Sequence, residues 1–259
     1  MSMALPGVQR DRVKGRGKVE KILVVQNLVK TYSGRRVVDQ VSFSVGRGEI
    51  VGLLGKNGAG KTTTFRMTVG MIQPEEGKVL FFGQDITHLP MYKRARLGMG
   101  YLSQETSVFR GLTVDENLEA ILQITPLTRR ERRRKKEELL SEFGLTHLRN
   151  SLASVLSGGE KRRLEIARSL VTNPRLLLLD EPFSGVDPIA VAEIQEIIYK
   201  LRDKGIGILL TDHNVRETLA TTNRSYIIYD GKIIAEGSRE DILSSEAARK
   251  YYLGEKFTM

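Results

Sequence analysis

A glycine-rich stretch between residues 55 and 62 carries the clearest chemical signal in the sequence. It reads GKNGAGKT and fits the pattern G-x-x-x-x-G-K-[ST] in full. Glycines at this spacing let backbone N–H groups wrap phosphate oxygens, while Lys61 neutralises charge on the β- and γ-phosphates and the Thr62 hydroxyl can bind Mg²⁺. The expected nucleotide contacts are Gly55, Asn57, Gly58, Ala59, Gly60, Lys61, Thr62 and Thr63.

Two acidic residues follow the most apolar short run of the chain. Leu176–Leu179 is unbroken leucine, which is typical of a strand at the buried centre of a parallel sheet, and Asp180 and Glu181 come directly after it. Phosphate hydrolysis needs one carboxylate that holds the metal and a base that orients and deprotonates water. We therefore assign Asp180 to Mg²⁺ and Glu181 to the attacking water.

The stretch LSGGE at residues 156–160 opens a helical pattern with two glycines. Ser157 and Glu160 have the spacing of a capping box, in which each side chain satisfies a backbone N–H of the first helical turn. Each glycine costs about 1 kcal/mol relative to alanine inside a helix. Gly158 and Gly159 leave bare N–H groups at the positive end of the helix, where a phosphate could approach closely.

These residues need elements that bring them together, and the chain alternates between strand and helix patterns. Helical patterns cover residues 113–150, 158–172 and 188–203, with Thr113 and Glu116 as a further capping box. Turns are expected at residues 46–48 and 83–85, and a hairpin turn at Asp230 and Gly231. The alternation predicts an α/β fold with a mainly parallel sheet. The expected strands are Ile22–Leu28, Val37–Val45, Ile50–Leu54, Lys78–Phe82, Met99–Leu102, Leu176–Leu179, Gly207–Thr211, Ser225–Tyr229 and Lys232–Ala235.

Composition limits the class of protein. The 259 residues contain no cysteine, which excludes disulfide scaffolds and thiolate chemistry, and no apolar run approaches the length of a membrane span. Residues 1–20 are polar and aperiodic, so we expect a flexible extension. The net charge is +10, and the basic run at residues 129–136 is either the solvated face of an amphipathic helix or a binding patch.

Taken in order, the motifs resemble those of the nucleotide-binding subunits of ABC transporters over nearly everything after residue 24. The resemblance is carried by GKNGAGKTT, Gln104, LSGGE, LLLLDEP, the segment Ser184–Asp187 and His213. It implies a P-loop NTPase core with an antiparallel β subdomain and an inserted α-helical subdomain. It also implies ATP and Mg²⁺ as ligands and a homodimer that closes on two ATP molecules.

The resemblance implies further roles by matched position. Ser157, Gly158 and Gly159 would contact the γ-phosphate of ATP held by the other subunit. Asp187 would communicate across the dimer, and Tyr32 would stack on adenine. Gln104 would lie beside Mg²⁺ and report the nucleotide state to the helical insertion, and His213 would bond to the γ-phosphate.

The chain is most similar to the ATPases of lipopolysaccharide-export transporters. Residues 100–110, residues 211–219 and the ending YLGEKF carry this likeness, although Lys56, Ser184 and Asn223 depart from the usual pattern. The ATPases of branched-chain amino acid importers are the nearest alternative, and a nucleic-acid or ribosome-associated ATPase is an alternative of another class. A single motif set, the absence of cysteine and a short insertion disfavour the latter, so no direct nucleic acid partner is expected.

The resemblance also implies an organisation and a location. Residues 21–259 would form one ABC ATPase domain, with the helical insertion at about 104–151 and a C-terminal hairpin and helices at about 225–259. Integral membrane subunits would dock near Gln104, Phe109 and Arg110. With no membrane span of its own, the chain would lie in the cytoplasm, peripheral on the cytoplasmic face of the inner membrane.

Overall fold

The computed structural model describes residues 20–254. The expected flexible extension therefore lies outside the described residues except for Glu20. The end of the YLGEKF stretch also lies outside them from Glu255 onward.

Two sheets form the frame of the described residues. One has the order β2-β1-β4-β5 and is antiparallel, and the other has the order β10-β9-β3-β8-β7-β6 and is parallel except at the β9–β10 hairpin. The alternating pattern therefore predicted the parallel sheet correctly. The strands are β1 (Lys21–Tyr32), β2 (Arg35–Gly46), β3 (Ile50–Leu54), β4 (Glu76–Phe81), β5 (Gln84–Asp85), β6 (Met99–Leu102), β7 (Leu176–Asp180), β8 (Gly207–Thr211), β9 (Arg224–Tyr229) and β10 (Lys232–Gly237).

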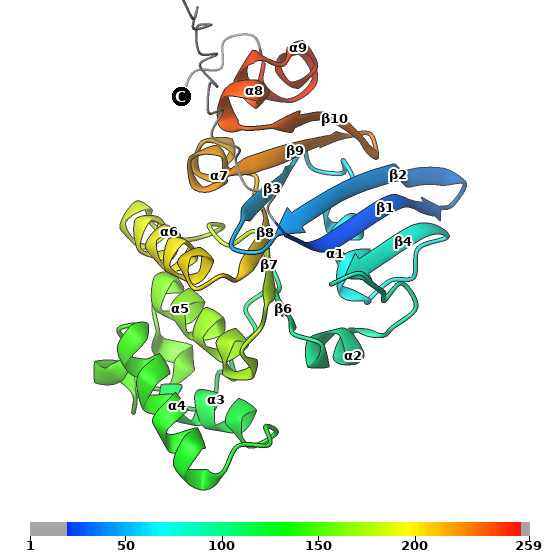
Figure 1. Cartoon of the computed structure of the whole chain (residues 1–259). Coiled ribbons are helices and arrows are strands. Elements are labelled where there is room, and N and C mark those ends of the chain that lie inside the picture. The colour runs from blue at the N-terminus through cyan, green and yellow to red at the C-terminus, as the bar shows by residue number, and fades with distance from the viewer. Residues whose placement is uncertain (1–19, 255–259) are drawn as a thin grey trace, which may run out of the picture.

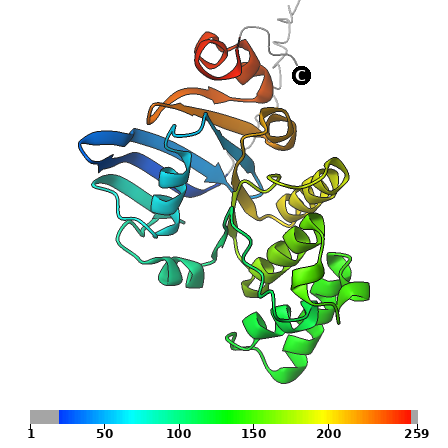
Figure 2. The ribbon, with the colours of Figure 1, turned by 180° about the vertical axis from the view of Figure 1, so that it is seen from behind.

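The helices separate into groups around these sheets. Figure 1 shows α3 and α4 at one end of the molecule and α8 and α9 at the other, and Figure 2 shows α1 beside the antiparallel sheet. The helices are α1 (Lys61–Val69), α2 (Met91–Arg96), α3 (Val114–Leu122), α4 (Arg129–Glu142), α5 (Gly158–Ser169), α6 (Pro188–Asp203), α7 (Val215–Thr221), α8 (Arg239–Ser244) and α9 (Glu246–Ala248). Shorter turns are η1 (Thr146–Leu148), η2 (Ala153–Val155), η3 (Leu170–Thr172) and the π-helical η4 (Arg249–Leu253).

The leucine run of β7 shows how the parallel sheet joins two cores. Leu177 and Leu179 pack with α3, α4, α5 and α6, whereas Leu176 and Leu178 pack with α1 and the antiparallel sheet. Successive strand side chains point to opposite faces, so a strand covered on both faces needs apolar residues at every position. β7 lies between β8 and the edge strand β6, so the run marks a strand that is buried on both faces but is not at the middle of the sheet, and the two acids follow at its carboxyl end.

The basic run forms most of α4. Thr128 begins this helix with a capping box that closes on Glu131, which the sequence analysis did not identify. Lys136 donates to Asp115 at 2.7 Å and to Glu119 at 3.0 Å, so part of the run fastens α4 to α3. The expected capping box of Thr113 and Glu116 is confirmed at the start of α3.

The turn expected at residues 83–85 begins one residue earlier and ends two residues earlier. The chain reverses at Phe82 and Gly83, which both have positive φ, and residues 84–85 already pair with β4. The expected hairpin turn at Asp230 and Gly231 is confirmed, again with positive φ at both residues, as a tight right-twisted hairpin requires.

Candidate active site

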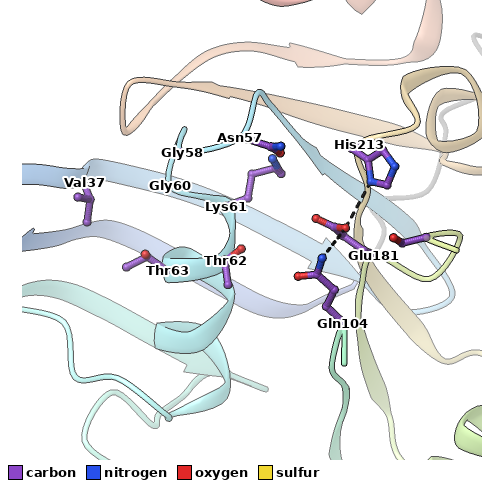
Figure 3. A pocket seen from close by; sticks show the side chains of 11 residues that line it. Val37, Asn57, Gly58, Gly60, Lys61, Thr62, Thr63, Gln104, Glu181 and His213 are labelled. Atoms are coloured by element: carbon purple, nitrogen blue, oxygen red, sulfur yellow. Dashed lines mark hydrogen bonds and ion pairs between the residues drawn. The ribbon is translucent and has the colours of Figure 1, made fainter. Parts of the chain in front are cut away.

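Four neighbouring strands end at one edge of the parallel sheet, and each delivers a predicted site residue there. In the order β3-β8-β7-β6, the glycine-rich loop follows β3, His213 follows β8, Glu181 follows β7 and Gln104 follows β6. Carboxyl ends of parallel strands are where such folds bind ligands. Figure 3 shows these side chains around one pocket of about 640 Å³. It is lined by Val37, Asn57, Gly58, Gly60, Lys61, Thr62, Thr63, Gln104, Glu181, Ser184 and His213.

The glycine-rich loop holds its lysine by backbone carbonyls. Lys61 Nζ donates to the carbonyl of Gly55 at 2.6 Å and to that of Lys56 at 3.1 Å. Burial lowers the pKa of Lys61, and the nearby carboxylates of Glu181 and Asp180 oppose this shift. The ammonium thus sits charged at the centre of a loop that presents N–H groups, which is the arrangement that suits an anionic phosphate.

A close approach explains why the loop has glycine at position 60. Gly60 has φ 106°, and a Cβ there would lie 2.4 Å from the carbonyl oxygen of Val37. Any side chain would therefore push β2 away from the loop. Since Val37 lines the pocket, the same contact places β2 against the site.

Glu181 is held at one carboxylate oxygen from two sides. Gln104 Nε2 donates to Glu181 Oε2 at 2.9 Å, and His213 Nδ1 lies 3.3 Å from the same oxygen (Figure 3). Glu181 has φ 49°, unusual for a residue other than glycine, and its N–H donates to the carbonyl of Thr211 at 2.8 Å. The other oxygen, Oε1, has no bonding partner among residues 20–254, so it is available to a ligand such as water.

Asp180 is suited to hold a magnesium ion. The Tyr101 hydroxyl lies 3.3 Å from Asp180 Oδ2, burial raises the pKa of Tyr101 to about 12, and the hydroxyl therefore stays protonated and donates. Burial also raises the pKa of Asp180, which marks a carboxylate that gains from a nearby cation. Asp180 Oδ1 is left without a protein partner in the described chain, and Asp180 and Thr62 line a second pocket of about 350 Å³ together with Gln104.

The metal would need oxygen ligands beyond the protein. Residues 20–254 contain no group of three or more histidine, aspartate or glutamate residues that could hold an ion unaided. Mg²⁺ commonly takes one or two protein oxygens and completes its shell with phosphate oxygens and water. Thr62 and Asp180 fit that pattern.

A buried arginine ties α5 to this edge, and the sequence analysis missed it. Arg162 donates to the carbonyl of Asp180 at 3.1 Å, to that of Ser103 at 3.1 Å and to Glu165 at 2.9 Å. Glu165 in turn accepts from the N–H of Ser107 at 2.6 Å. The segment around Gln104 is therefore fastened to α5. The i,i+3 spacing of Arg162 and Glu165 is visible in the sequence, but nothing there shows that the pair is buried.

Tyr32 is one of the predicted nucleotide contacts that do not line the pocket; Gly55 and Ala59 are others. It ends β1, is 45% exposed and lies under Lys30, whose Nζ is 5.6 Å from the ring centroid. Tyr32 does not line the pocket, whereas Val37 and Ser184, which were not predicted, do. Stacking of Tyr32 on adenine remains a proposal.

The turn formed by residues 156–160, called the signature turn below, is capped as predicted. Glu160 N–H donates to Ser157 Oγ at 3.2 Å, and Ser157 N–H donates to Glu160 Oε2 at 2.8 Å. Gly158 is exposed, but Gly159 is buried, and a Cβ on Gly159 would lie 2.6 Å from the Cβ of Ala190. The expectation that both glycines keep a surface open therefore needs correction, because Gly159 faces its own chain.

Asp187 serves as the N-cap of α6. Its Oδ1 accepts from the N–H of Ala190 at 3.0 Å, and Pro188 takes the first helical position. None of Ser157, Gly158, Gly159 and Asp187 lines the pocket. A single chain thus presents a nucleotide pocket and, away from it, a capped turn with free N–H groups.

The residues that depart from the lipopolysaccharide-export pattern leave the pocket's charged groups in place. Lys56 is exposed, Ser184 lines the pocket, and Asn223 accepts from the N–H of Ile50 at 2.9 Å, which ties β9 to β3.

Across the described residues, every helix is too short or too polar to cross a bilayer.

Curated relatives cover most of this chain. It is 54% identical over 239 residues to the lipopolysaccharide export system ATP-binding protein LptB of Haemophilus influenzae, a match that spans 92% of this chain and 99% of that protein. The protein of the same name from Escherichia coli K12 is 54% identical over 238 residues, with the same shares covered. An uncharacterized ABC transporter ATP-binding protein of Rhizobium meliloti is 51% identical over 96% of this chain and 92% of its own length.

Solved structures agree with this likeness. An ATP-binding cassette of an ABC transporter in its ADP conformation superposes with a TM-score of 0.81 at 31% identity, covering 91% of this chain and 99% of that one. A dimeric cassette in a post-hydrolysis state with ADP and Pi has a TM-score of 0.74 at 25% identity, covering 84% of this chain and 98% of that one. The ABC transporter family model matches residues 38–184. With the pocket, the signature turn and the sheet order in place, this chain belongs to the ABC transporter family.

Proposed function

We propose that this chain hydrolyses ATP with Mg²⁺ as one of two identical subunits that power a membrane transporter. The observation that carries the proposal is the convergence of Gln104 and His213 on Oε2 of Glu181, in a pocket that also holds Lys61. A carboxylate held at one oxygen presents the other oxygen in a defined direction. That is what a base needs in order to orient a single water molecule.

The chemistry follows from these positions. The water oxygen attacks the γ-phosphorus, the bond from that phosphorus to the β–γ bridging oxygen breaks, and the water proton passes to Glu181. Lys61 balances charge on the β- and γ-phosphates. The Mg²⁺ held by Thr62 and Asp180 would neutralise charge that develops on the phosphate oxygens. His213 and Gln104 orient Glu181 and lie where a γ-phosphate and metal would approach.

The free N–H groups of the signature turn support a dimer in which each ATP touches both subunits. A helix N-terminus with unpaired N–H groups attracts phosphate, and α5 starts with two glycine N–H groups that have no acceptor in the described chain. Because the turn does not line its own pocket, the phosphate would belong to the other subunit. The dimeric cassette with ADP and Pi among the solved relatives is consistent with this arrangement.

Two lysines of one loop test the proposal. Lys61→Ala should abolish tight nucleotide binding and hydrolysis, because the buried ammonium at the β- and γ-phosphates is lost. Lys56→Ala is the matched control, since Lys56 is exposed in the same loop and should bind nucleotide normally. Nucleotide affinity and phosphate release would be measured for both. Normal turnover by Lys61→Ala would overturn the assignment.

We further propose that the transported substrate is lipopolysaccharide and that the subunit works on the cytoplasmic face of the inner membrane. The names of the two relatives at 54% identity support this assignment. Purification of the tagged chain from detergent-solubilised membranes should recover integral membrane proteins together with lipopolysaccharide. Recovery of an amino acid importer instead would contradict the assignment of the substrate.

The groove for the membrane subunit would lie next to Gln104. The second pocket, of about 350 Å³, shares Gln104 and Thr62 with the first and is also lined by Asp180, Met71, Ile72 and Tyr101. Gln104 thus borders both spaces, as a reporter of the nucleotide state would. Nearby in the chain, Phe109 is 43% exposed and lies outside the apolar cores.

Phe109 and Arg110 should anchor the membrane subunit. The Arg168 guanidinium lies 4.3 Å from the centroid of the Phe109 ring, which holds this apolar side chain at the surface. Replacing Phe109 and Arg110 with alanine should weaken assembly while basal hydrolysis and the melting temperature stay near those of the parent. A large drop in melting temperature would instead show that Phe109 supports the fold of the insertion.

A further inference from the structure

The start of α5 packs on the start of α6 at a single point where no side chain fits. An ideal Cβ on Gly159 would lie 2.6 Å from the Cβ of Ala190 and 3.9 Å from its Cα. Carbon atoms in contact normally lie about 3.5–4.0 Å apart. Neither partner is the end of a flexible side chain, so an alanine at position 159 would force the two helix starts apart by about 1 Å.

Ala190 cannot yield easily, because the start of α6 is fixed. The Asp187 side chain accepts from the N–H of Ala190 at 3.0 Å, and the Asp187 carbonyl accepts from the N–H of Val191 at 2.9 Å. One turn further along, Arg163 of α5 forms an ion pair with Glu193 of α6. A push at Gly159 would therefore tilt the signature turn while the later parts of both helices stay joined.

The segment that leads into α6 begins at the proposed base. Ser184 N–H donates to the carbonyl of Glu181 at 3.3 Å, and the N–H of Phe183 donates to Asp212 at 3.0 Å. A Cβ on Gly158 would lie 3.2 Å from the carbonyl oxygen of Gly185 in the same segment. Residues 181–190 thus connect Glu181 to the signature turn of the same subunit.

We propose that Gly159 and Ala190 form a size-matched contact that positions the signature turn on its own α6, and that Ala190 is a positioning residue for the dimer. The inference rests on the proposed function, since the turn matters only if it contacts the partner's ATP. It gives Gly159 a role within its own subunit. In the dimer, each signature turn would contact one ATP molecule. The same turn packs on residues 181–190 of its own chain, which begin with the base that acts on the other ATP molecule.

An exchange of the two residues tests the contact in the Glu181→Gln background, where ATP should trap the dimer. Gly159→Ala should weaken ATP-dependent dimerisation about tenfold or more, as over-packing of one tight contact does. Adding Ala190→Gly should restore the dimer, because the new Cβ then meets only the Cα at 3.9 Å, an ordinary contact. Ala190→Gly alone should still dimerise, with a melting temperature lower by about 2–4 °C from the glycine in the helix.

Gly158→Ala is the matched control. Its Cβ would meet the carbonyl of Gly185, so Ala190→Gly should not improve whatever dimer it forms. Sedimentation with and without ATP, binding of a fluorescent ATP analogue to the monomer and thermal melting would be measured for every variant. The proposal requires that Gly159→Ala keep the monomer's nucleotide affinity and remain folded at the assay temperature.

Three outcomes would overturn the inference. The first is normal dimerisation by Gly159→Ala, and the second is loss of its ATP binding together with the dimer. The third is a double variant that stays defective, which would place the role of Gly159 at the phosphate. Failure of the Glu181→Gln parent itself to dimerise with ATP would be a different result. It would overturn the proposed ATP-bridged dimer and the inference that depends on it.

Discussion

The nucleotide pocket and the signature turn are built by opposite means. In the pocket, charged side chains from the ends of neighbouring strands converge, and Gln104 and His213 meet at Glu181. At the signature turn, the structure provides backbone N–H groups, one serine cap and a contact with Ala190 in which Gly159 contributes no side chain. The first region is defined by which side chains are present. The second is defined by which are absent.

The nucleotide pocket and the signature turn should therefore respond differently to substitution. Pocket residues act through charge and proton transfer, so conservative changes of functional group should remove activity while leaving the fold intact. The signature turn acts through position, so small changes of volume should disturb the dimer while leaving the pocket able to bind ATP.

The largest effect is expected at Glu181. Glu181→Gln should lower turnover by a factor of about 10²–10⁴, because an amide cannot accept the water proton. ATP binding should persist, and the variant should accumulate as a dimer in the presence of ATP. Glu105→Gln, an exposed acid near Gln104, is the control and should hydrolyse normally. Steady-state phosphate release and size-exclusion chromatography would measure both effects; full turnover by Glu181→Gln would contradict the role of base.

A smaller effect is expected at the cap of the signature turn. Ser157→Ala removes a helix cap that contributes about 0.5–2 kcal/mol, and Thr128→Ala removes an equivalent cap from α4. Both should therefore lower the melting temperature by a similar amount. Only Ser157→Ala should also weaken the ATP-dependent dimer of Glu181→Gln. Equal dimerisation by the two variants would show that the signature turn matters only for local stability.

The smallest effect is expected at Tyr101. Tyr101→Phe removes the hydroxyl that donates to Asp180. Loss of a hydrogen-bond partner of a metal ligand typically lowers metal affinity by about 10-fold to 100-fold. The effect should be smaller here, because the bond is as long as 3.3 Å. The Mg²⁺ concentration required for half-maximal activity should rise severalfold, while binding of ATP without metal should not change. Tyr92→Phe, at an exposed tyrosine, is the control. An unchanged Mg²⁺ requirement would contradict the proposed role of the hydroxyl.

The sequence predicted most of the pocket because its residues carry their chemistry in their type and in their position after a strand. Lys61, Asp180, Glu181, Gln104 and His213 all lie at the same sheet edge. Strand alternation also explains the leucine run of β7. What remained hidden was the order of the strands, which decides that Gln104 and His213 reach Glu181 from opposite sides.

The missed residues share a physical reason. Arg162 and Glu165 look like surface charges on a helix, and only the packing of α5 against the sheet buries them. Tyr101 reads as one more apolar strand residue until β6 pairs with β7 and its hydroxyl reaches Asp180. The contact of Gly159 with Ala190 depends on how closely two helices approach, and no pattern within either helix encodes that distance.

The central claim is that the signature turn of one subunit completes the pocket of the other, and the chain's lack of cysteine allows a direct measurement. Two versions of Glu181→Gln would be mixed, one carrying Asn57→Cys in the pocket and the other Ser157→Cys in the signature turn. A disulfide needs Cα atoms within about 7 Å. With ATP, an oxidised cross-link should form between the two versions, and without ATP it should be absent. A dimer that forms with ATP and yields no such cross-link would contradict the central claim.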